Sequence, residues 1–187
     1  MTRIVAGVAG GRRLKVPAQG TRPTSERVRE ALFSSLSARI DLDGASVLDL
    51  YAGSGALGLE ALSRGAEHVM MVDASAKAAA VVRENVAVLG LAGAVVRTAP
   101  AAAVVAGAAD REYDVVFLDP PYAVSEDEVA AVLGALVPGG WVGEGSLVVF
   151  ERAVRAPETV WPTGFETGKV RKYGDTRVEI ACYGLQS

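Results

Sequence analysis

A short apolar run that leads through a glycine-rich turn into a helix constrains this chain more than any other stretch. Residues 47–50 read Val-Leu-Asp-Leu, which predicts a buried strand. Residues 53–55 read Gly-Ser-Gly, a turn that glycine makes cheaply because positive φ has no steric cost without a Cβ. The pattern is helical from Ala56 onward, with Leu57, Ala61 and Leu62 on one face. Such an element offers bare backbone and a helix N-terminus to a ligand, so it predicts nucleotide binding.

The acid beside the glycines says more about the ligand than the glycines do. Gly53, Gly55 and Gly58 stand at the spacing of the dinucleotide fingerprint, which NAD-dependent oxidoreductases share. Asp49, however, lies in the strand just before the turn, where a carboxylate repels a pyrophosphate and attracts a cation. S-adenosylmethionine carries a sulfonium and an ammonium, so we expect this cofactor. The alternative is a tight crossover turn without a ligand.

The later segments alternate between strands and helices, which predicts a doubly wound, Rossmann-like α/β fold with right-handed crossovers. Further strands are predicted at 67–73, 94–98, 113–118 and 146–151, and helices at 75–89, within 99–109, and at 125–137. An antiparallel pair at 165–170 and 177–183, around 173–175, completes a mostly parallel seven-stranded sheet with an antiparallel edge hairpin. Ligands bind beyond the carboxyl ends of parallel strands, so Asp73 is predicted beside the glycine turn, where it would hold ribose hydroxyls. Its alternative role is helix capping.

Composition limits the functional classes. Half of the 187 residues are hydrophobic, which is typical of one globular domain with a sizeable core. With one cysteine, the chain has no internal disulfide or cysteine-based metal cluster, and any histidine chemistry would depend on His68 alone. We therefore expect no metal, and we expect His68 to cap or pack at the start of its strand. No signal-peptide pattern and no apolar run of about 18 residues is present, so we expect a cytoplasmic protein.

Basic residues concentrate near the N-terminus. The net charge is −3, yet residues 1–39 hold eight Lys and Arg against two acids and so carry +6. Runs at 3–7 and 13–17 around Gly10-Gly11 predict a β-hairpin with arginines at its tip, which must dock on the body or be fixed by a ligand. We expect an extension over 1–20 that contacts nucleic-acid phosphates, and a catalytic domain over 21–187. The candidate contacts, which could instead be solvated surface, are Arg3, Arg12, Arg13, Lys15, Arg22 and Arg27.

A helix is predicted between the hairpin and the first long strand. Thr24 is expected to cap it, and it would run to about Ala38. Arg27 and Arg29 would flank its apolar stripe, which consists of Val28, Ala31, Leu32, Ser35 and Leu36.

A second chemical motif, Asp119-Pro120-Pro121-Tyr122, directly follows the predicted strand 113–118. Its two prolines fix the backbone and remove two N–H donors, which leaves the Asp119 carboxylate and the Pro120 carbonyl as acceptors. Together these can take both hydrogens of an exocyclic amine and direct the nitrogen lone pair toward a methyl group, while Tyr122 offers a flat face to an unstacked base. Alignment then supplies most of the catalysis, and Asp119 or water takes the proton. The alternative is a proline-rich loop with a core tyrosine.

With these motifs the chain resembles the class I S-adenosylmethionine-dependent methyltransferases that carry Asp-Pro-Pro-Tyr, and more closely the RsmD family of 16S ribosomal RNA guanine-N2 methyltransferases. The resemblance rests on residues 3–17, 22–33, 49–60, 119–122 and 173–176. It implies that ribosomal RNA, in a small-subunit particle, is the partner, and that the guanine amine meets Asp119, Pro120 and Tyr122. Pro121 completes the predicted catalytic loop. It also implies that the cofactor lies over residues 49–55 with its ribose on Asp73. The predicted cofactor site as a whole consists of Asp49, Tyr51, Gly53, Ser54, Gly55, Gly58, Asp73, Ala74 and Ala99.

One stretch departs from the pattern of related methyltransferases, many of which have an acid after the third strand, near adenine. Here residues 97–100 read Arg-Thr-Ala-Pro, so adenine would be held by backbone groups and by Ala74 and Ala99. Three other functions stay open at this point. A DNA amino-methyltransferase acting on adenine or cytosine would use the same motif. An NAD-dependent oxidoreductase conflicts with Asp49 and lacks a substrate domain, and a non-catalytic RNA-binding module would leave residues 119–122 without a role.

Overall fold

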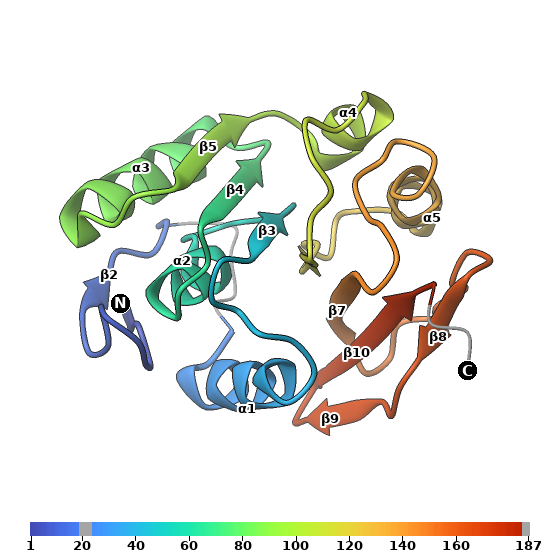
Figure 1. Cartoon of the computed structure of the whole chain (residues 1–187), viewed down its shortest axis with the longest axis horizontal. Coiled ribbons are helices and arrows are strands. Elements are labelled where there is room, and N and C mark those ends of the chain that lie inside the picture. Colours follow the sequence, from blue (N-terminus) through green and yellow to red (C-terminus); the bar gives the residue numbers. More distant parts are fainter. Residues whose placement is uncertain (19–23, 185–187) are drawn as a thin grey trace.

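A twisted sheet with helices on both faces dominates the computed structural model, which describes residues 1–18 and 24–184 (Figure 1). Its strand order is β5-β4-β3-β6-β7-β10-β8. The five strands that pair in parallel are β3 (Ser46–Asp49), β4 (His68–Asp73), β5 (Ala94–Thr98), β6 (Val115–Leu118) and β7 (Leu147–Ala153). β10 (Thr176–Tyr183) pairs antiparallel with β7. The predicted fold class is confirmed.

The outer edge of the sheet differs from the prediction. The expected strand 165–170 is only β8 (Phe165–Thr167), and a second strand, β9 (Arg171–Tyr173), follows it. Both pair with β10, β8 near Tyr183 and β9 near Thr176, so eight strands occupy seven positions in the described part of the chain. The turn between β9 and β10 is tight because Gly174 adopts a φ of +58°.

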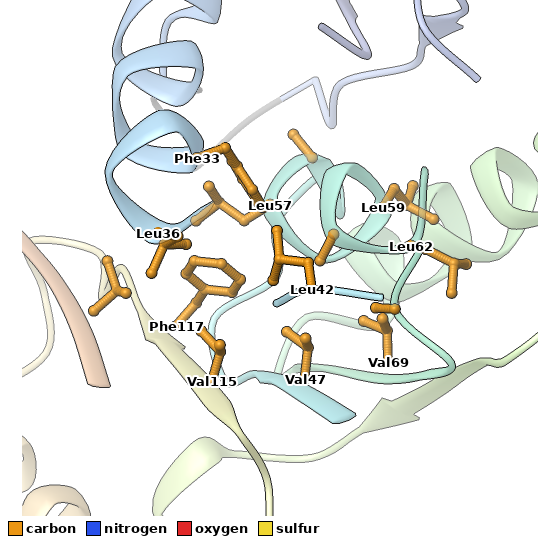
Figure 2. Close-up of a cluster of buried hydrophobic side chains, with 14 of the residues drawn as sticks. Phe33, Leu36, Leu42, Val47, Leu57, Leu59, Leu62, Val69, Val115 and Phe117 are labelled. Atoms are coloured by element: carbon orange, nitrogen blue, oxygen red, sulfur yellow. The ribbon is translucent and has the colours of Figure 1, made fainter. Parts of the chain in front are cut away.

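The two faces of the sheet carry separate cores, because successive side chains along a strand point to opposite faces. On one face Val47, Val69, Val115 and Phe117 pack under α1 (Glu26–Ser37), α2 (Ala56–Ser63) and α3 (Ala76–Leu89), as Figure 2 shows for α1 and α2. The other face packs against α4 (Ala101–Ala106) and α5 (Glu126–Ala135). Within the described residues no helix is long and apolar enough to cross a membrane.

Helix α1 corrects two expectations. Its N-cap is Ser25, whose Oγ accepts a hydrogen bond from Val28 N at 3.2 Å, so Thr24 is not the cap. Its buried residues are Arg29, Leu32, Phe33 and Leu36. Arg29 therefore points inward rather than flanking the apolar stripe, because a buried acid on α2 receives it.

Helix α2 is buried on all sides, whereas the sequence predicted one apolar face. The N-terminal hairpin, formed by β1 (Thr2–Arg3) and β2 (Arg13–Leu14), lies against it. Ala9 N donates to Ser63 Oγ at 2.9 Å, and Ile4 and Leu14 join the core. The predicted hairpin is confirmed with shorter strands, and it docks on the body.

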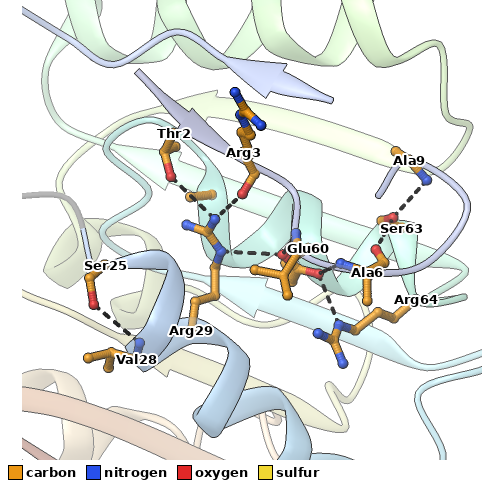
Figure 3. A network of polar contacts seen from close by, with 12 residues as sticks. Thr2, Arg3, Ala6, Ala9, Ser25, Val28, Arg29, Glu60, Ser63 and Arg64 are labelled. Carbon is orange, nitrogen blue, oxygen red and sulfur yellow. Dashed lines mark hydrogen bonds and ion pairs between the residues drawn. The ribbon is translucent and has the colours of Figure 1, made fainter. Parts of the chain in front are cut away.

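A polar network fixes this docking (Figure 3). The fully buried Glu60 carboxylate accepts hydrogen bonds from Val5 N at 2.7 Å, Ala6 N at 3.1 Å, Arg29 Nε at 3.3 Å and Arg64 Nε at 3.0 Å. Arg29 Nη2 in turn donates to Thr2 Oγ1 and to the backbone carbonyl of Arg3. Burial lowers the pKa of Arg29, and the charge of Glu60 opposes this shift. The hairpin is thus held by charge pairing as well as by apolar contacts.

Candidate active site

Three strand ends bring the predicted site residues to one edge of the sheet. β3 lies between β4 and β6, and all three run parallel. Leu50 N donates to Phe117 O at 3.1 Å, and Ala52 N donates to Val72 O at 2.9 Å. The glycine turn after β3 therefore lies between Asp73, at the end of β4, and the residue 119–122 loop after β6. His68 lies at the other end of β4, where its Nε2 is 3.4 Å from the Tyr113 hydroxyl oxygen.

Asp49 is a buried acid with incomplete hydrogen bonding. Its side chain is 1% exposed, and Oδ2 accepts a hydrogen bond from Gly58 N at 3.2 Å. Oδ1 has no hydrogen-bond partner among the described residues. Burial, and then the charge of Asp73, raises the pKa of Asp49 to about 7. Such a carboxyl gains most from a cation or a donor placed beside it.

The glycines of the turn differ in what they do. Gly53 and Gly55 have φ values of +59° and +82°, in the left-handed region, and Gly55 is the N-cap of α2. A Cβ at Gly58 would lie 2.8 Å from Met71 Cγ, so Gly58 is required by the packing of α2 on β4. Its N–H also orients Asp49, as described above. Gly58 thus shapes the site through Asp49 and through helix packing.

Asp73 fastens the glycine turn. Oδ2 accepts a hydrogen bond from Gly53 N, and Oδ1 accepts one from Ser75 N, both at 2.9 Å. The N-cap of α3 is Ser75, whose Oγ accepts from Ala78 N, so the capping alternative for Asp73 is wrong. Each carboxylate oxygen keeps a second lone pair for a ligand.

The remaining predicted cofactor residues surround this turn. The Tyr51 hydroxyl is buried without a hydrogen-bond partner in the described structure, and burial raises its pKa to about 12. Ser54 is buried, and its carbonyl accepts from Asn85 Nδ2 at 2.9 Å. Ala74 is exposed, while the partly buried Ala99 donates its N–H to Asp73 O at 3.0 Å. Ala74 and Ala99 therefore flank Asp73.

The residue 119–122 loop presents an acid and an exposed ring. Asp119 and Pro120 are partly buried, Pro121 is exposed, and Tyr122 is 77% exposed, so the alternative of a core tyrosine is wrong. Burial, followed by the charges of Glu151 and Asp49, raises the pKa of Asp119. Asp119 Oδ2 lies 3.4 Å from Thr24 Oγ1.

Sequence reasoning missed Thr24 and Glu151 as parts of this site. Thr24 Oγ1 donates to Glu151 Oε2 at 2.8 Å, and Glu151 lies on β7, next to β6. Glu151 was predicted to end its strand, so the rule of carboxyl strand ends could have identified it. The assignment of Thr24 to a helix cap concealed its contact with the site.

The predicted phosphate contacts form two groups on the hairpin and α1. Arg3 and Arg27 line a groove of about 490 Å³ between them, together with Glu26 and Glu30. Arg12, Arg13 and Lys15 are exposed. Arg12 donates to Val88 O at 2.8 Å, and Lys15 pairs with Glu84 at 2.8 Å. Arg22 lies outside the described residues. The basic surface is therefore partly balanced by acids.

One side chain joins the hairpin to the glycine turn. Asn85 of α3 donates through Nδ2 to Ser54 O and to Lys15 O, at 2.9 Å and 3.0 Å, and accepts from Lys15 N at 2.9 Å.

Among the described side chains, no group of three or more His, Cys, Asp or Glu residues is arranged to hold a metal ion.

Two solved structures with this architecture are described as a putative methyltransferase and a putative methylase. The chain superposes on a putative methyltransferase, YhhF from Escherichia coli, with a TM-score of 0.88 and 29% identity over 99% of both chains. A structure from Haemophilus influenzae described as a putative methylase has a TM-score of 0.80 and 27% identity, over 97% of this chain and 98% of that one. The fold and the strand-end site together define a Rossmann-like methyltransferase.

Sequence comparison narrows this class. The family model described as conserved hypothetical protein 95 matches residues 2–182. A putative rRNA methyltransferase, YlbH from Bacillus subtilis, is 40% identical over 164 residues, 84% of this chain and 87% of the relative. Ribosomal RNA small subunit methyltransferase D from E. coli K12 is 37% identical over 153 residues, 81% of this chain and 75% of the relative. The chain therefore belongs to this family, the RsmD methyltransferases.

Proposed function

We propose that the protein transfers a methyl group from S-adenosylmethionine to the exocyclic N2 amine of a guanine in 16S ribosomal RNA. The observation that carries this proposal is the juxtaposition of two loops at neighbouring strand ends. The glycine turn with Asp49 and Asp73 lies beside the residue 119–122 loop with Asp119. The relatives named as ribosomal RNA methyltransferases support RNA as the acceptor.

The cofactor side of the site fits a cationic nucleoside. The unpartnered Oδ1 of Asp49 and its raised pKa favour a ligand that brings positive charge. Asp73 would hold ribose hydroxyls with its remaining lone pairs, and Ala74 and Ala99 would flank adenine. When bound, S-adenosylmethionine supplies an electrophilic methyl group on its sulfonium. Tyr51, Gly53, Ser54, Gly55 and Gly58 would complete the site, Gly58 through its hydrogen bond to Asp49.

The acceptor side would orient an amine. The Asp119 carboxylate and the Pro120 carbonyl would accept its two N–H hydrogens, and Pro121 keeps the loop rigid. The ring of Tyr122 would stack on a guanine withdrawn from its helix, consistent with its exposure. Asp119 would then take the proton that the amine loses, which suits a carboxyl whose pKa is raised.

The RNA would be held by Arg3, Arg12, Arg13, Lys15, Arg22 and Arg27. The first four belong to the hairpin, whose backbone the Glu60 network holds against the body of the protein, as Figure 3 shows. We propose a small-subunit particle as the natural substrate, which would place the protein in the cytoplasm.

Labelled cofactor tests this function directly. The protein is incubated with methyl-labelled S-adenosylmethionine and 16S RNA, small-subunit particles or a DNA duplex, and the modified nucleoside is identified by mass spectrometry. The expected product is N2-methylguanosine in RNA. Label in DNA adenine or cytosine would replace the proposed function with that of a DNA amino-methyltransferase, and no label in any acceptor would refute it.

A further inference from the structure

Thr24 connects two acids of the site without serving the helix that follows it. Because Ser25 caps α1, the Thr24 hydroxyl is available for other contacts. Its Oγ1 lies 2.8 Å from Glu151 Oε2 and 3.4 Å from Asp119 Oδ2. Three distant segments of the chain thus meet at one hydroxyl: the residue before the N-cap of α1, the loop after β6, and β7.

The charges facing Asp119 come from two neighbouring strands. Glu151 faces it from β7 and Asp49 from β3, and both raise the pKa of Asp119, whereas the Thr24 hydrogen bond lowers it. The charge of Asp73 on β4 raises the pKa of Asp49. Arg152, the next residue on β7, points to the opposite face, where its guanidinium lies 5.0 Å from the Phe150 ring and pairs with Glu126.

The Thr24 hydroxyl has one hydrogen, which it can donate to Glu151 at 2.8 Å or to the ionised Asp119 at 3.4 Å. Donation to the ionised carboxylate is the contact that lowers the pKa of Asp119. The Thr24 oxygen can also accept a hydrogen from Asp119 when this carboxyl is protonated. A protonated Asp119, Thr24 and Glu151 then form a continuous hydrogen-bonded chain.

We propose that Thr24 is a positioning residue for methyl transfer, whose hydroxyl holds the Asp119 carboxyl at the acceptor amine and passes the proton released there on to Glu151. The inference rests on the proposed function. The amine N–H bond breaks and its proton binds an Asp119 oxygen. That proton moves to Thr24 Oγ1 as the hydrogen of Thr24 moves to Glu151 Oε2. Asp119 is ionised again for the next turnover, and Glu151, which is only partly buried, exchanges its proton with water.

This route matters because burial raises the pKa of Asp119, so that its carboxyl gives up a proton less readily than an exposed aspartate does. Once protonated, it can accept fewer hydrogens from the next amine. Loss of the Thr24 hydroxyl should slow turnover, because the proton route is interrupted, and should raise the pKa of Asp119, because the hydrogen bond that Thr24 donates to the ionised carboxylate is lost. Loss of the charge on Glu151 should lower the pKa of Asp119. The two changes shift the acid limb of the pH profile in opposite directions, which a purely structural role would not do.

Four variants test the inference. For Thr24→Val we expect kcat to fall about tenfold to a hundredfold, as for the loss of a hydrogen bond to a charged group, with KM for cofactor and RNA little changed. Thr24→Ser should restore kcat. Glu151→Gln should move the acid limb to lower pH. Thr159→Val is the matched control, because Thr159 Oγ1 donates to Glu179 at 2.6 Å elsewhere on the sheet, and it should change neither kcat nor the profile.

Carbon-13 NMR of the Asp119 carboxyl separates this inference from the proposed function, because the titration needs no methyl acceptor. The Asp119 pKa should rise in Thr24→Val, fall in Glu151→Gln and stay unchanged in Thr159→Val. An Asp119 titration that Thr24→Val leaves unchanged, or a loss of kcat that Thr24→Ser does not restore, would overturn the role of Thr24. Absence of RNA methylation by the unaltered protein would instead overturn the proposed function.

Discussion

Two buried carboxylates, Glu60 and Asp49, lie near opposite ends of the same strand–turn–helix element and have opposite surroundings. Both are almost fully inaccessible, at 0% and 1% exposed. Glu60 accepts four hydrogen bonds, two of them from the guanidinium groups of Arg29 and Arg64. Asp49 accepts one from Gly58, and within the described residues its other oxygen has no hydrogen-bond partner.

The difference separates an acid that holds the fold together from one that the proposed function would use. A buried carboxylate that is paired and hydrogen-bonded holds in place the groups that supply its donors. Here these are the hairpin and α1. A buried carboxyl that is short of donors has a raised pKa, and such groups are more frequent at ligand sites. The donors that Asp49 lacks are those that a cationic ligand would bring.

The strongest way to break the comparison is to remove the structural acid. Glu60→Ala leaves Arg29 buried without its partner, so we expect a loss of about 3–5 kcal/mol in the free energy of unfolding, measured with urea. Glu84→Ala is the control, because its pair with Lys15 is exposed and should contribute less than about 1 kcal/mol. Equal losses in the two variants would contradict the role given to Glu60.

Asp119→Ala tests the functional side. We expect methyl transfer to fall about 10²- to 10³-fold, as when one group that orients the reacting atoms is removed. Cofactor affinity by calorimetry and the urea midpoint should change little, because Asp119 is not a predicted cofactor contact. Unchanged turnover would refute its role.

Asp49→Asn tests the raised pKa of Asp49 through the pH dependence of the free energy of unfolding. The folded pKa of Asp49, about 7, lies above the ordinary value of 3.8, so its neutral form favours folding at low pH. This stability is present below pH 4 and is lost as the pH rises through 7, by up to about 1.4 kcal/mol per unit. The variant should lose this slope in urea titrations between pH 4 and 7, gain stability at pH 8, and bind the cofactor less tightly. A slope equal to that of the unaltered protein would contradict the raised pKa.

The smallest effect concerns the hairpin. Arg13→Ala should weaken RNA binding and lower the salt dependence of the association constant by about one phosphate contact. Arg111→Ala, on the loop before β6 at the other end of the sheet, should leave the salt dependence unchanged. Point variants are preferable to deletion of residues 1–20, because Ile4, Ala9 and Leu14 belong to the core. A salt dependence that Arg13→Ala leaves unchanged would remove Arg13 from the RNA contacts.

The sheet could be predicted because each of its main strands has a local sequence pattern. The Val-rich runs at β3, β4 and β6 and the glycines after them require only neighbouring residues to interpret, and α3 lies where Ser75 and Gly90 indicate. The burial of Arg29 could not be predicted in this way. It depends on Glu60, 31 residues away, and along the chain Arg29 has the pattern of a surface charge.

Within the site, the loops were predictable and the links between them were not. Asp49, Asp73 and Asp119 follow from strand ends, since parallel strands share an edge. Thr24 and Ser25 are equivalent N-cap candidates in sequence, and only the structure shows that Ser25 caps the helix while Thr24 contacts Glu151. The adenine contacts of Ala74 and Ala99 stay a prediction.

The three hydrogen bonds of Asn85 give the hairpin a further consequence. They join the backbone of Lys15 and the carbonyl of Ser54 to one planar amide, which restrains the distance between the hairpin and the glycine turn. Under the proposed function, the distance between the hairpin that binds the RNA and the cofactor site would determine which nucleotide reaches the methyl group. Nucleotides at another distance from the bound phosphates would not reach the site. Because the protein would not need to change conformation, binding of the target nucleotide would cost little conformational entropy on the protein side.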